Sequence, residues 1–560
     1  MNRDRPAVSG PASAWGSPRF ADPRLATIAA ADGAAAAWRE ALRAGDAAAA
    51  AQGVTGDFAL VAQRDDGSIV CAVDRFAVRT LCWRVAGGRL EVAPRADALA
   101  GPAPALDVQA IHDYLHFHVV PAPRTVHAGV QRLPAGHLLE FRDGRAEVRP
   151  YWRPRFAARR DVAFAPLAAE FRALLRTAVA AELGHGKPAC FLSGGTDSST
   201  VAGMIRDASG ERPATYSIGF DAEGYDEMAY ARIAARHFDT EHHEYYLSPA
   251  DLVRGIPVVA AAYDQPFGNS SALPAYCCAR IAAGDGVAKL LAGDGGDELF
   301  GGNARYAKQR VFEAYARVPA ALRRALVEPL AGATRGLPLL GKGFSYVEQA
   351  RTPLPARMDS YNLLGRLGIE RVLTAAFRER IDLADAQAQQ QRVWDAIDAD
   401  DATNRQLAFD WRYTLAEADL PKVVGTTALA GIEVGFPMLA QPLVDFSLAL
   451  PVSYKLRGMK LRWFFKEALR GFLPDAIIAK RKQGFGLPFG VWALADAALG
   501  ALAHDALGSF ATRGIVEPTF IGALESTLLR EHPGYYGEMV WILVMLEHWL
   551  RAHAPDFRID

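Results

Sequence analysis

The chain lacks the features that mark secreted, membrane-spanning and nucleic-acid-binding proteins. Its 560 residues include five cysteines, which form no Cys-x-x-Cys pair and no His-spaced set, so neither a disulfide framework nor a zinc site is indicated. The N-terminus lacks the apolar core of a signal peptide, and no uncharged apolar run reaches the ~18 residues of a membrane span. The 62 Lys and Arg balance 63 Asp and Glu, so no general field attracts nucleic acid or anionic lipid. We therefore predict a cytoplasmic protein with buried thiols and with no nucleic-acid or membrane partner.

The first part of the chain contains short apolar runs. Residues 1–25 are rich in Pro, Gly and Ser and predict a loose leader, and the Ala-rich stretch 25–52 predicts one or two helices. In 56–92, alternating apolar runs are separated by Asp-Asp-Gly and Ala-Gly-Gly, and a similar run surrounds Asp143-Gly144. Because these patterns are typical of antiparallel hairpins, we expect a β-rich first domain over residues 1–155.

The remainder of the chain has the pattern of an α/β domain. Short continuous apolar runs at 189–192, 214–220 and 288–293 alternate with longer helical patterns. Such runs between helices predict a buried parallel sheet. From Arg305 onward the pattern is almost entirely helical. We therefore expect a second domain over residues 156–560, with a parallel sheet and a helical C-terminal part.

One glycine-containing loop has the pattern of a phosphate site. Phe191-Leu192 predicts a strand end, Ser193-Gly194-Gly195-Thr196-Asp197-Ser198 a turn, and the following residues a helix. Backbone N–H groups beside glycines and at a helix start can bind an oxyanion. The Gly-Lys-[Ser/Thr] ending of the common P-loop is missing. Because the Asp197 carboxylate would repel phosphate, it is explained best by a Mg²⁺ ion that bridges the two. The alternative is an ordinary turn that caps a helix.

A second loop follows another apolar strand. Gly293-Asp294-Gly295-Gly296-Asp297-Glu298 places three carboxylates close together, and their repulsion calls for a cation or a cationic ligand. Taken alone, this segment is also compatible with a solvated turn or a calcium loop. Both loops are expected at the carboxyl ends of neighbouring parallel strands, where open α/β sheets bind ligands.

These two loops, SGGTDSS at 193–199 and GDGGDELFGG at 293–302, resemble those of the PP-loop ATP pyrophosphatases, and specifically of the asparagine synthetase family. Further segments match in the family's order over nearly the whole chain: Asp57 in GDF, Asp74-Arg75-Phe76 with Arg79, PAPRT at 121–125, LPAGH at 133–137, SIGF at 217–220, DQPFGNSSALP at 264–274 and AKRKQGFGLPFGVW at 479–492. The resemblance implies a β-sandwich like that of N-terminal-nucleophile hydrolases, followed by a PP-loop domain.

The resemblance also implies an ATP-dependent, amide-forming ligase. ATP would be cleaved between its α and β phosphates to give an acyl-adenylate and Mg-pyrophosphate. Ammonia or an amine would then attack the activated carbonyl of a small-molecule carboxylate. By the same resemblance, residues of both loops and of one neighbouring strand would bind ATP and pyrophosphate: Leu192, Ser193, Gly194, Gly195, Asp197, Ser198, Ile218 and Gly293.

Four charged residues receive more specific roles from the resemblance. Asp197 and Asp297 would hold Mg²⁺. Lys482, just before Gly484-Phe485, would stabilise negative charge as the adenylate forms and collapses, the alternative being a solvated basic run. Asp294 stands where the family commonly has Glu, and it is the candidate for deprotonating the attacking amine.

Several departures from the family pattern concern the substrates. Gln265 replaces the usual Glu in DQPFG, and the segment 433–440, EVGFPMLA, lacks the Arg and Asp of the family's EVR-PFLD motif. Adenylation is therefore predicted more firmly than aspartate as the substrate. Glutamine-dependent members begin, after Met removal, with a cysteine that hydrolyses glutamine. Here residue 2 is Asn2, and Cys71 lies inside an expected strand, so we predict a glutaminase-like domain without glutaminase activity.

The nitrogen source and the acyl acceptor stay open at this point. Either a small acid such as aspartate accepts ammonia, or a larger carboxylate in peptide, antibiotic or polysaccharide biosynthesis is amidated. An internal amine could instead close a lactam or macrolactam ring. A catalytically inactive scaffold is a further alternative, and tRNA modification is disfavoured because sulfur-handling cysteines and a basic face are missing. A homodimer and a separate ammonia-supplying partner are also kept open.

Overall fold

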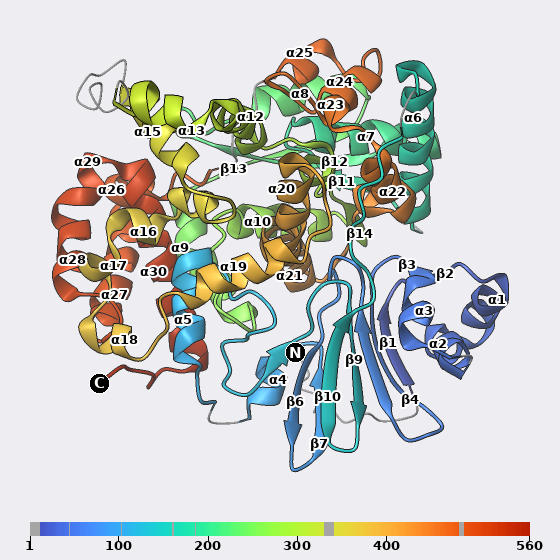
Figure 1. Ribbon diagram of the computed structural model, residues 1–560, viewed down its shortest axis with the longest axis horizontal. Coiled ribbons are helices and arrows are strands. Elements are labelled where there is room, and N and C mark those ends of the chain that lie inside the picture. The colour runs from blue at the N-terminus through green and yellow to red at the C-terminus, as the bar shows by residue number, and fades with distance from the viewer. Residues whose placement is uncertain are drawn as a thin grey trace.

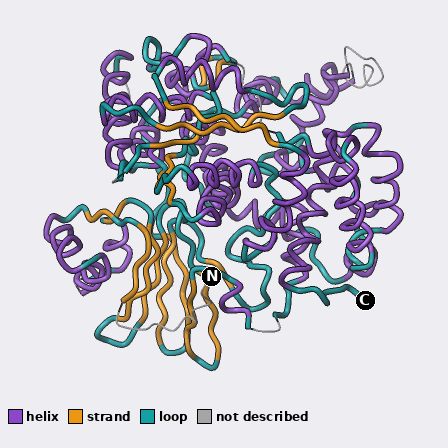
Figure 2. Tube along the Cα trace, turned by 180° about the vertical axis from the view of Figure 1, so that it is seen from behind, coloured by secondary structure: helices purple, strands orange, loops and turns teal. Residues whose placement is uncertain are grey.

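The computed structural model describes residues 12–43, 45–101, 104–159, 162–184, 186–329, 341–480 and 486–560, with only the backbone described at 326–327 and 341–345. Figure 1 shows antiparallel strands of the first part of the chain, in blue to cyan, below a larger region in which helices surround a second sheet. The view from behind in Figure 2 shows the same two regions. This arrangement confirms the expected fold class, an antiparallel sandwich followed by a parallel-sheet domain with a helical C-terminal part.

The N-terminal part consists of three layers. Its two antiparallel sheets have the strand orders β1-β4-β5-β9-β10 and β7-β6-β8. The strands are β1 (Ala12–Gly16), β4 (Phe58–Gln63), β5 (Ile69–Val73), β6 (Cys82–Ala86), β7 (Arg89–Ala93), β8 (Gln131–Arg132), β9 (His137–Arg142) and β10 (Arg145–Pro150). The third layer contains helices α1 (Pro23–Asp32), α2 (Ala34–Arg43) and α3 (Ala47–Gln52), which a short ribbon of β2 (Arg19–Phe20) and β3 (Val54–Thr55) flanks.

Strand β4 shows why these layers form. Phe58 and Leu60 pack with Trp38 of α2 on one face, whereas Ala59 and Val61 pack in the interior between the two sheets. Because successive side chains of a strand point to opposite faces, a strand that is apolar at every position is buried on both. The larger sheet is therefore the middle layer.

The expected loose leader is wrong for the residues that the structure describes. Residues 12–16 form β1, which pairs antiparallel with β4 from Ala12 opposite Ala62 to Gly16 opposite Phe58. Gly16 has a φ of +90°, and a Cβ there would lie 2.3 Å from the Asp57 carbonyl oxygen. The segment ASAWG has weak apolar alternation, which is why its pattern did not predict this strand.

The second domain is built on a five-stranded parallel sheet in the order β13-β12-β11-β14-β15. Its strands are β11 (Ala189–Phe191), β12 (Ala214–Phe220), β13 (Glu241–Leu247), β14 (Lys289–Leu291) and β15 (Glu433–Gly435). The three apolar runs expected to form strands are β11, β12 and β14. Strands β13 and β15 were not expected, because the polar residues of β13 form no apolar run and the three residues of β15 lie within a helical region.

Helices cover both faces of the parallel sheet. On one face Cys190 and Leu291 pack with apolar residues of α6 (Phe164–Glu182), α7 (Thr196–Ser209) and α8 (Met228–His237). On the other face Tyr216 and Leu290 pack against α10 (Ala272–Gly284), which in turn contacts α21 (Leu420–Ala430). A parallel sheet covered on both faces matches the continuous apolar runs that predicted it.

The C-terminal region is helical, as expected. Its long helix α30 (Pro533–His553) buries Trp541, Met545 and Trp549 and packs against α9 (Pro249–Ala262), α26 (Phe489–Ala495) and α27 (Ala497–Ala511). Helix α5 (Val108–Phe117) of the first part reaches this core, where the Tyr114 hydroxyl donates to the Ile542 carbonyl at 2.8 Å. Within the described ranges, α30 included, no helix has the length and hydropathy needed to span a bilayer.

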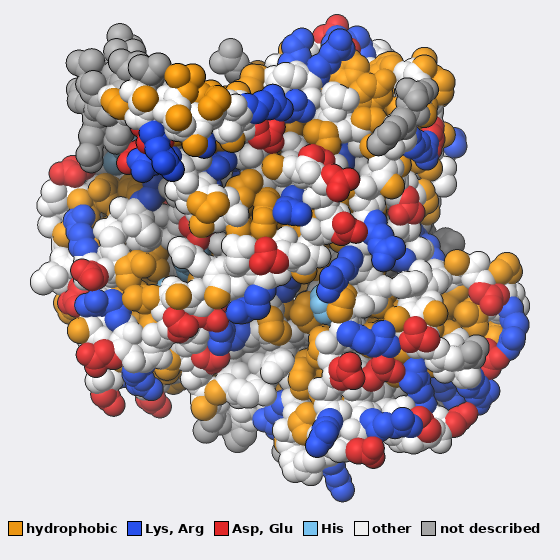
Figure 3. All heavy atoms as spheres, viewed as in Figure 1, with side chains coloured by type: hydrophobic (Ala, Val, Ile, Leu, Met, Phe, Trp, Pro, Cys, Tyr) orange, Lys and Arg blue, Asp and Glu red, His pale blue; other side chains and the backbone are white. Residues whose placement is uncertain are grey.

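The remaining elements connect these regions. They are α4 (Asp97–Ala100), α11 (Gly296–Phe300), α12 (Ala304–Arg317), α13 (Ala320–Leu322), η1 (Arg323–Val327), α15 (Gly341–Arg351), η2 (Ala356–Tyr361), α16 (Leu363–Leu367), α17 (Ile369–Val372), α18 (Ala375–Glu379), α19 (Asp385–Asp395), α20 (Ala402–Asp410), η3 (Trp411–Asp419), η4 (Pro437–Leu439), α22 (Gln441–Ala449), α23 (Val452–Lys455), β16 (Leu456–Arg457), β17 (Lys460–Leu461), α24 (Trp463–Ala468), α25 (Asp475–Ala479), α28 (Pro518–Ala523), η5 (Leu524–Leu528) and α29 (Leu529–Glu531). On the face drawn in Figure 3, basic and acidic side chains are interspersed, as the balanced composition predicts.

Candidate functional site

The two glycine-containing loops meet at one edge of the parallel sheet. Strands β11 and β14 are hydrogen-bonded neighbours, with Cys190 opposite Leu291, and each runs into its loop at the same end. A Cβ on Gly293 would lie 2.9 Å from the Ser198 nitrogen and 3.0 Å from the Asp197 carbonyl carbon. The loops therefore touch at Gly293, and a side chain there would separate them.

The first loop closes on itself before α7 begins. Ser198 Oγ accepts from the Ser193 N–H at 3.1 Å and lies 3.0 Å from Ser193 Oγ. Gly195 is the N-cap residue of α7 and contributes no capping side chain, and backbone N–H groups at a helix start can bind an oxyanion. Gly194, with a φ of +69°, faces α8, because a Cβ there would lie 2.4 Å from the Ala231 nitrogen.

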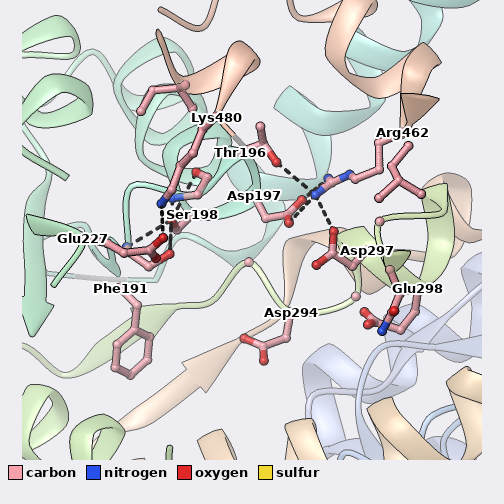
Figure 4. Close-up of a pocket in the computed structure, with 18 of the residues that line it drawn as sticks. Phe191, Thr196, Asp197, Ser198, Glu227, Asp294, Asp297, Glu298, Arg462 and Lys480 are labelled. Atoms are coloured by element: carbon pink, nitrogen blue, oxygen red, sulfur yellow. Dashed lines mark hydrogen bonds and ion pairs between the residues drawn. The ribbon is translucent and has the colours of Figure 1, made fainter. Parts of the chain in front are cut away.

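A large cavity opens where the two loops meet. Its volume is about 1080 Å³, and nine of the residues expected to act here line it: Leu192, Ser193, Gly195, Asp197, Ser198, Ile218, Gly293, Asp294 and Asp297. Gly194 shapes the loop behind this wall. Lys482 lies outside the described residues, so its role remains a prediction. Figure 4 shows how the charged side chains are grouped along the cavity.

One arginine joins the two carboxylates that were expected to hold Mg²⁺. Arg462 follows β17, and its Nη1 donates to Asp197 Oδ2 at 2.6 Å and to Asp297 Oδ1 at 2.7 Å. Its Nη2 also donates to Asp197 Oδ1, and Thr196 Oγ1 lies 2.9 Å from Nη1. The two distant acids thus converge on one nitrogen atom, as Figure 4 shows.

Arg462 is held rigidly at its backbone and is buried. It has a φ of +54°, its carbonyl accepts from the Lys466 N–H at 3.0 Å, and 4% of its surface is exposed. The guanidinium lies 4.0 Å from the centre of the Phe465 ring. Burial lowers the pKa of Arg462, but the carboxylates of Asp197 and Asp297 outweigh this and raise it above the usual arginine value. The residue is a permanent cation in this structure.

Asp294 belongs to a separate ion group. Lys422 Nζ lies 3.3 Å from Asp294 Oδ1 and 3.3 Å from Asp419 Oδ1. Burial raises the pKa of Asp294, and Lys422 opposes the shift. Burial lowers the pKa of Lys422, whereas Asp294 and Asp419 raise it further than burial lowers it. In Figure 4 the Asp294 carboxylate points away from Asp197 and Asp297, so it is free to serve a different part of a substrate.

A third ion pair anchors the chain just before residue 481. Lys480 Nζ lies 3.0 Å from Glu227 Oε1 and 3.4 Å from the Gly194 carbonyl oxygen, above the ring of Tyr230. The ion pair ties the end of α25 to the start of α8, and the contact with Gly194 ties it to the first loop. Lys480, the last residue described before position 481, therefore lies at the cavity wall.

The residues present fit a magnesium ion. In the described ranges, no three Asp, Glu, His or Cys side chains are grouped so as to hold a metal alone. Two carboxylates and a hydroxyl do converge on Nη1 of Arg462. Mg²⁺ usually binds one or two carboxylates and takes its remaining ligands from phosphates and water. The two carboxylates found here match the part of that donor set that a protein supplies.

The sequence missed the cations of this site. The repulsion among acids called for a positive partner, but Arg462 lies 165 residues from Asp297 and Lys422 lies 128 residues from Asp294. Neither stands in a glycine-containing motif. The only signal in the sequence was that the clustered acids need a positive partner, and this does not identify which Lys or Arg supplies it.

Models of known protein families match both parts of the chain. The model of the asparagine synthase family matches residues 170–551, and that of the glutamine amidotransferase domain matches residues 40–152. Asparagine synthetase [glutamine-hydrolyzing] 1 of Bacillus subtilis is 24% identical over 448 residues, which cover 79% of this chain and 69% of that protein. A putative asparagine synthetase [glutamine-hydrolyzing] of Mycobacterium bovis is 27% identical over 442 residues, 76% of this chain and 65% of that protein.

A third relative makes a different product. The carboxyethyl-arginine beta-lactam-synthase of Streptomyces clavuligerus is 31% identical over 258 residues, which cover 45% of this chain and 47% of that protein. The chain thus spans about two thirds of the length of the two asparagine synthetases above and about half of the lactam synthase.

The parallel sheet, the paired loops and these matches together define a carbon–nitrogen ligase that uses ATP. More particularly, the chain belongs to the asparagine synthase family, whose model matches more than half of its residues. The resemblance inferred from the sequence motifs is confirmed.

Proposed function

We propose that the chain activates a carboxylate as an acyl-adenylate, releases pyrophosphate, and transfers ammonia or an amine to the acyl group. The observation that carries the proposal is the convergence of Asp197 and Asp297, from two separate loops, on one point of a cavity of about 1080 Å³. We further propose that residues 1–155 form a glutamine-amidotransferase-like domain without its catalytic cysteine, and that residues 156–560 form the synthetase domain.

The proposed roles follow from the positions of the side chains. The N–H groups at the start of α7 would bind phosphate oxygens, with Ser193 and Ser198 beside them. Asp197 and Asp297 would hold Mg²⁺. Bound there, the ion would neutralise the pyrophosphate as it leaves. Lys482 would stabilise the adenylate.

Asp294 is proposed as the base for the attacking amine. Its carboxylate lies apart from the metal pair, and Lys422 fixes its position. A base must be ionised to accept a proton, and Lys422 supports the ionised form that burial disfavours. The amine would therefore approach from the Lys422 side of the cavity.

A second candidate is an intramolecular reaction that closes a lactam ring. The similarity to a beta-lactam synthase supports it. A Cβ on Gly435 would lie 2.6 Å from Glu182 Oε2 and 2.9 Å from the Lys289 side chain, and these two residues form an ion pair of 2.8 Å. Glycine thus stands beside this ion pair where the family's EVR motif has arginine, and this departure supports an acyl substrate other than aspartate.

Pyrophosphate release with a panel of carboxylates tests the proposal. The panel is run with ammonium, with glutamine and with no added nitrogen source. Release that depends on a carboxylate and on ammonium supports amidation, whereas loss of water from a single substrate, seen by mass spectrometry, supports ring closure. Asp197→Ala should abolish release in every arm, and retention of full activity would remove Asp197 from the mechanism. A homodimer, an ammonia-supplying partner and a cytoplasmic location stay predictions.

A further inference from the structure

The nitrogen atom Nη1 of Arg462 lies in an oxygen cage. Three oxygens from three side chains surround it: Asp197 Oδ2 at 2.6 Å, Asp297 Oδ1 at 2.7 Å and Thr196 Oγ1 at 2.9 Å. The nitrogen carries two hydrogens, so three oxygens exceed the number of bonds that it can donate singly. Magnesium–oxygen distances are about 2.0–2.1 Å, so a contraction of roughly 0.5–0.9 Å would turn this cage into a metal site.

A divalent cation and this guanidinium cannot occupy the cage together. Nη1 lies within 2.9 Å of all three oxygens, and Nη2 donates to the second oxygen of Asp197. The metal ion and the guanidinium are both positively charged. In this buried environment the repulsion between them would be screened poorly. Metal therefore binds only after the guanidinium leaves.

The guanidinium has few other anchors. Arg462 Nε is buried and makes no hydrogen bond with the part of the chain that the structure describes. The backbone is fixed at the start of α24, so a rotation of the side chain is enough to vacate the cage. The adjoining cavity has room for this rotation. The phosphates of a bound nucleotide would offer the displaced guanidinium new anionic partners.

We propose that Arg462 is a placeholder cation, which occupies the metal position between Asp197 and Asp297 and excludes divalent metal until a nucleoside triphosphate arrives. The proposal rests on the proposed function, because it takes the cage as the Mg²⁺ position. Its consequence is that metal and nucleotide bind cooperatively, since each favours the state in which the guanidinium has moved. Arg462 thus controls metal binding as a positioning residue and takes no part in the reaction itself.

Manganese binding without turnover tests this role. Free Mn²⁺ is titrated by electron paramagnetic resonance against the full chain, alone and with an α,β-methylene ATP analogue. Wild type should bind Mn²⁺ weakly alone and at least about 10-fold more tightly with the analogue. Arg462→Gln should bind Mn²⁺ about 10-fold more tightly than wild type without nucleotide. Arg462→Gln combined with Asp197→Asn should lose that gain, because the cage then lacks one carboxylate.

Arg470→Gln is the matched control. Arg470 lines the same cavity but pairs with Glu467 and Asp475, so its loss should leave Mn²⁺ binding without nucleotide unchanged. Arg462→Lys is a second variant for the case that the glutamine variant misfolds. A single ammonium keeps the charge but cannot bridge both acids, so this variant should have an intermediate Mn²⁺ affinity. Thermal unfolding verifies that each variant is folded.

The possible results separate the two proposals. If the folded Arg462→Gln and Arg462→Lys variants bind Mn²⁺ alone no better than wild type, the placeholder role is overturned, while nucleotide-dependent Mn²⁺ binding by wild type would still support the proposed function. Tight Mn²⁺ binding by wild type without nucleotide also overturns the placeholder role. Failure of every protein to bind Mn²⁺ with the analogue overturns both proposals.

Discussion

Two regions of the molecule use aspartates in opposite ways. In the N-terminal sandwich, Asp74 is 2% exposed and accepts from four backbone N–H groups, those of Phe58, Phe76, Val78 and Arg79, at 3.0–3.3 Å. At the edge of the parallel sheet, Asp197 and Asp297 are held by Arg462, and Asp294 by Lys422. Both sets stand in motifs that resemble the same family.

The difference between these regions distinguishes an aspartate that supports the fold from aspartates that can contact a ligand. The partners of Asp74 are backbone groups, which cannot leave without unfolding the local chain, so Asp74 can only support the fold. The partners of Asp197, Asp297 and Asp294 are side chains on a cavity wall, which can move aside for a ligand. A motif aspartate is therefore a candidate for chemistry when its counter-charge is mobile and faces open space.

The largest expected effect is that of Asp197→Asn. The amide keeps the shape of the side chain but removes the charge that would hold a metal, so pyrophosphate release should fall by about 10³-fold. The melting temperature should stay near that of wild type, because Arg462 keeps Asp297 as its partner. A coupled pyrophosphate assay and thermal unfolding measure the two effects. A loss of less than about 10-fold would place Asp197 with Asp74 as a structural residue.

Asp294→Asn should have the next largest effect. If Asp294 is the base, amide formation should fall by about 10²-fold, whereas adenylation, measured as ATP–pyrophosphate exchange, should fall less. Because burial raises the pKa of Asp294, wild-type amide formation should rise with pH through a limb above the usual Asp range, and this limb should vanish in the variant. Asp419→Asn is the control, since Asp419 lies equally far from Lys422. Equal losses in both variants would contradict the assignment.

The strands and loops that carry the acids could be predicted from sequence, but their partners could not. Apolar runs located β11, β12 and β14, and the two loops followed from glycine and aspartate within them. Strand β1 and the three-residue β15 were missed, because their pairing depends on distant strands rather than on local pattern. Arg462 was missed for the same reason, since its backbone position is set by α24 and its partners lie on other elements. Charged residues that pair across long sequence separations have no characteristic spacing in the sequence from which the pair could be predicted.

Asp74→Asn should weaken the fold and leave the chemistry intact. An amide would direct N–H donors at backbone N–H groups, so the free energy of unfolding should fall by about 2 kcal/mol. Pyrophosphate release per folded molecule should be unchanged. Denaturant unfolding and active-site-normalised assays measure both. A variant with full stability and reduced turnover would show that Asp74 acts at a ligand, contrary to its contacts.

The same residue gives a pH test of stability. Burial raises the pKa of Asp74 to about 6, against an ordinary value of about 3.9. Between about pH 4 and pH 6 the folded chain then holds a proton that the unfolded chain has released, so the contribution of Asp74 to stability falls as pH rises through this window. Asp74→Asn should lack this slope when denaturant midpoints are compared across the same range.

Cys71→Ala is expected to have the smallest effect, with no change in turnover. A glutaminase needs an accessible thiolate, but Cys71 lies between the two sheets with 1% exposure, and burial raises its pKa to about 12. The other four cysteines are buried as well. Purified wild type should therefore release no glutamate from glutamine, and Cys71→Ala should match it in pyrophosphate release with ammonium. Glutamate release that Cys71→Ala abolishes would mean that the sandwich opens to expose this thiol, and the contrast between a structural first domain and a reactive second one would no longer hold.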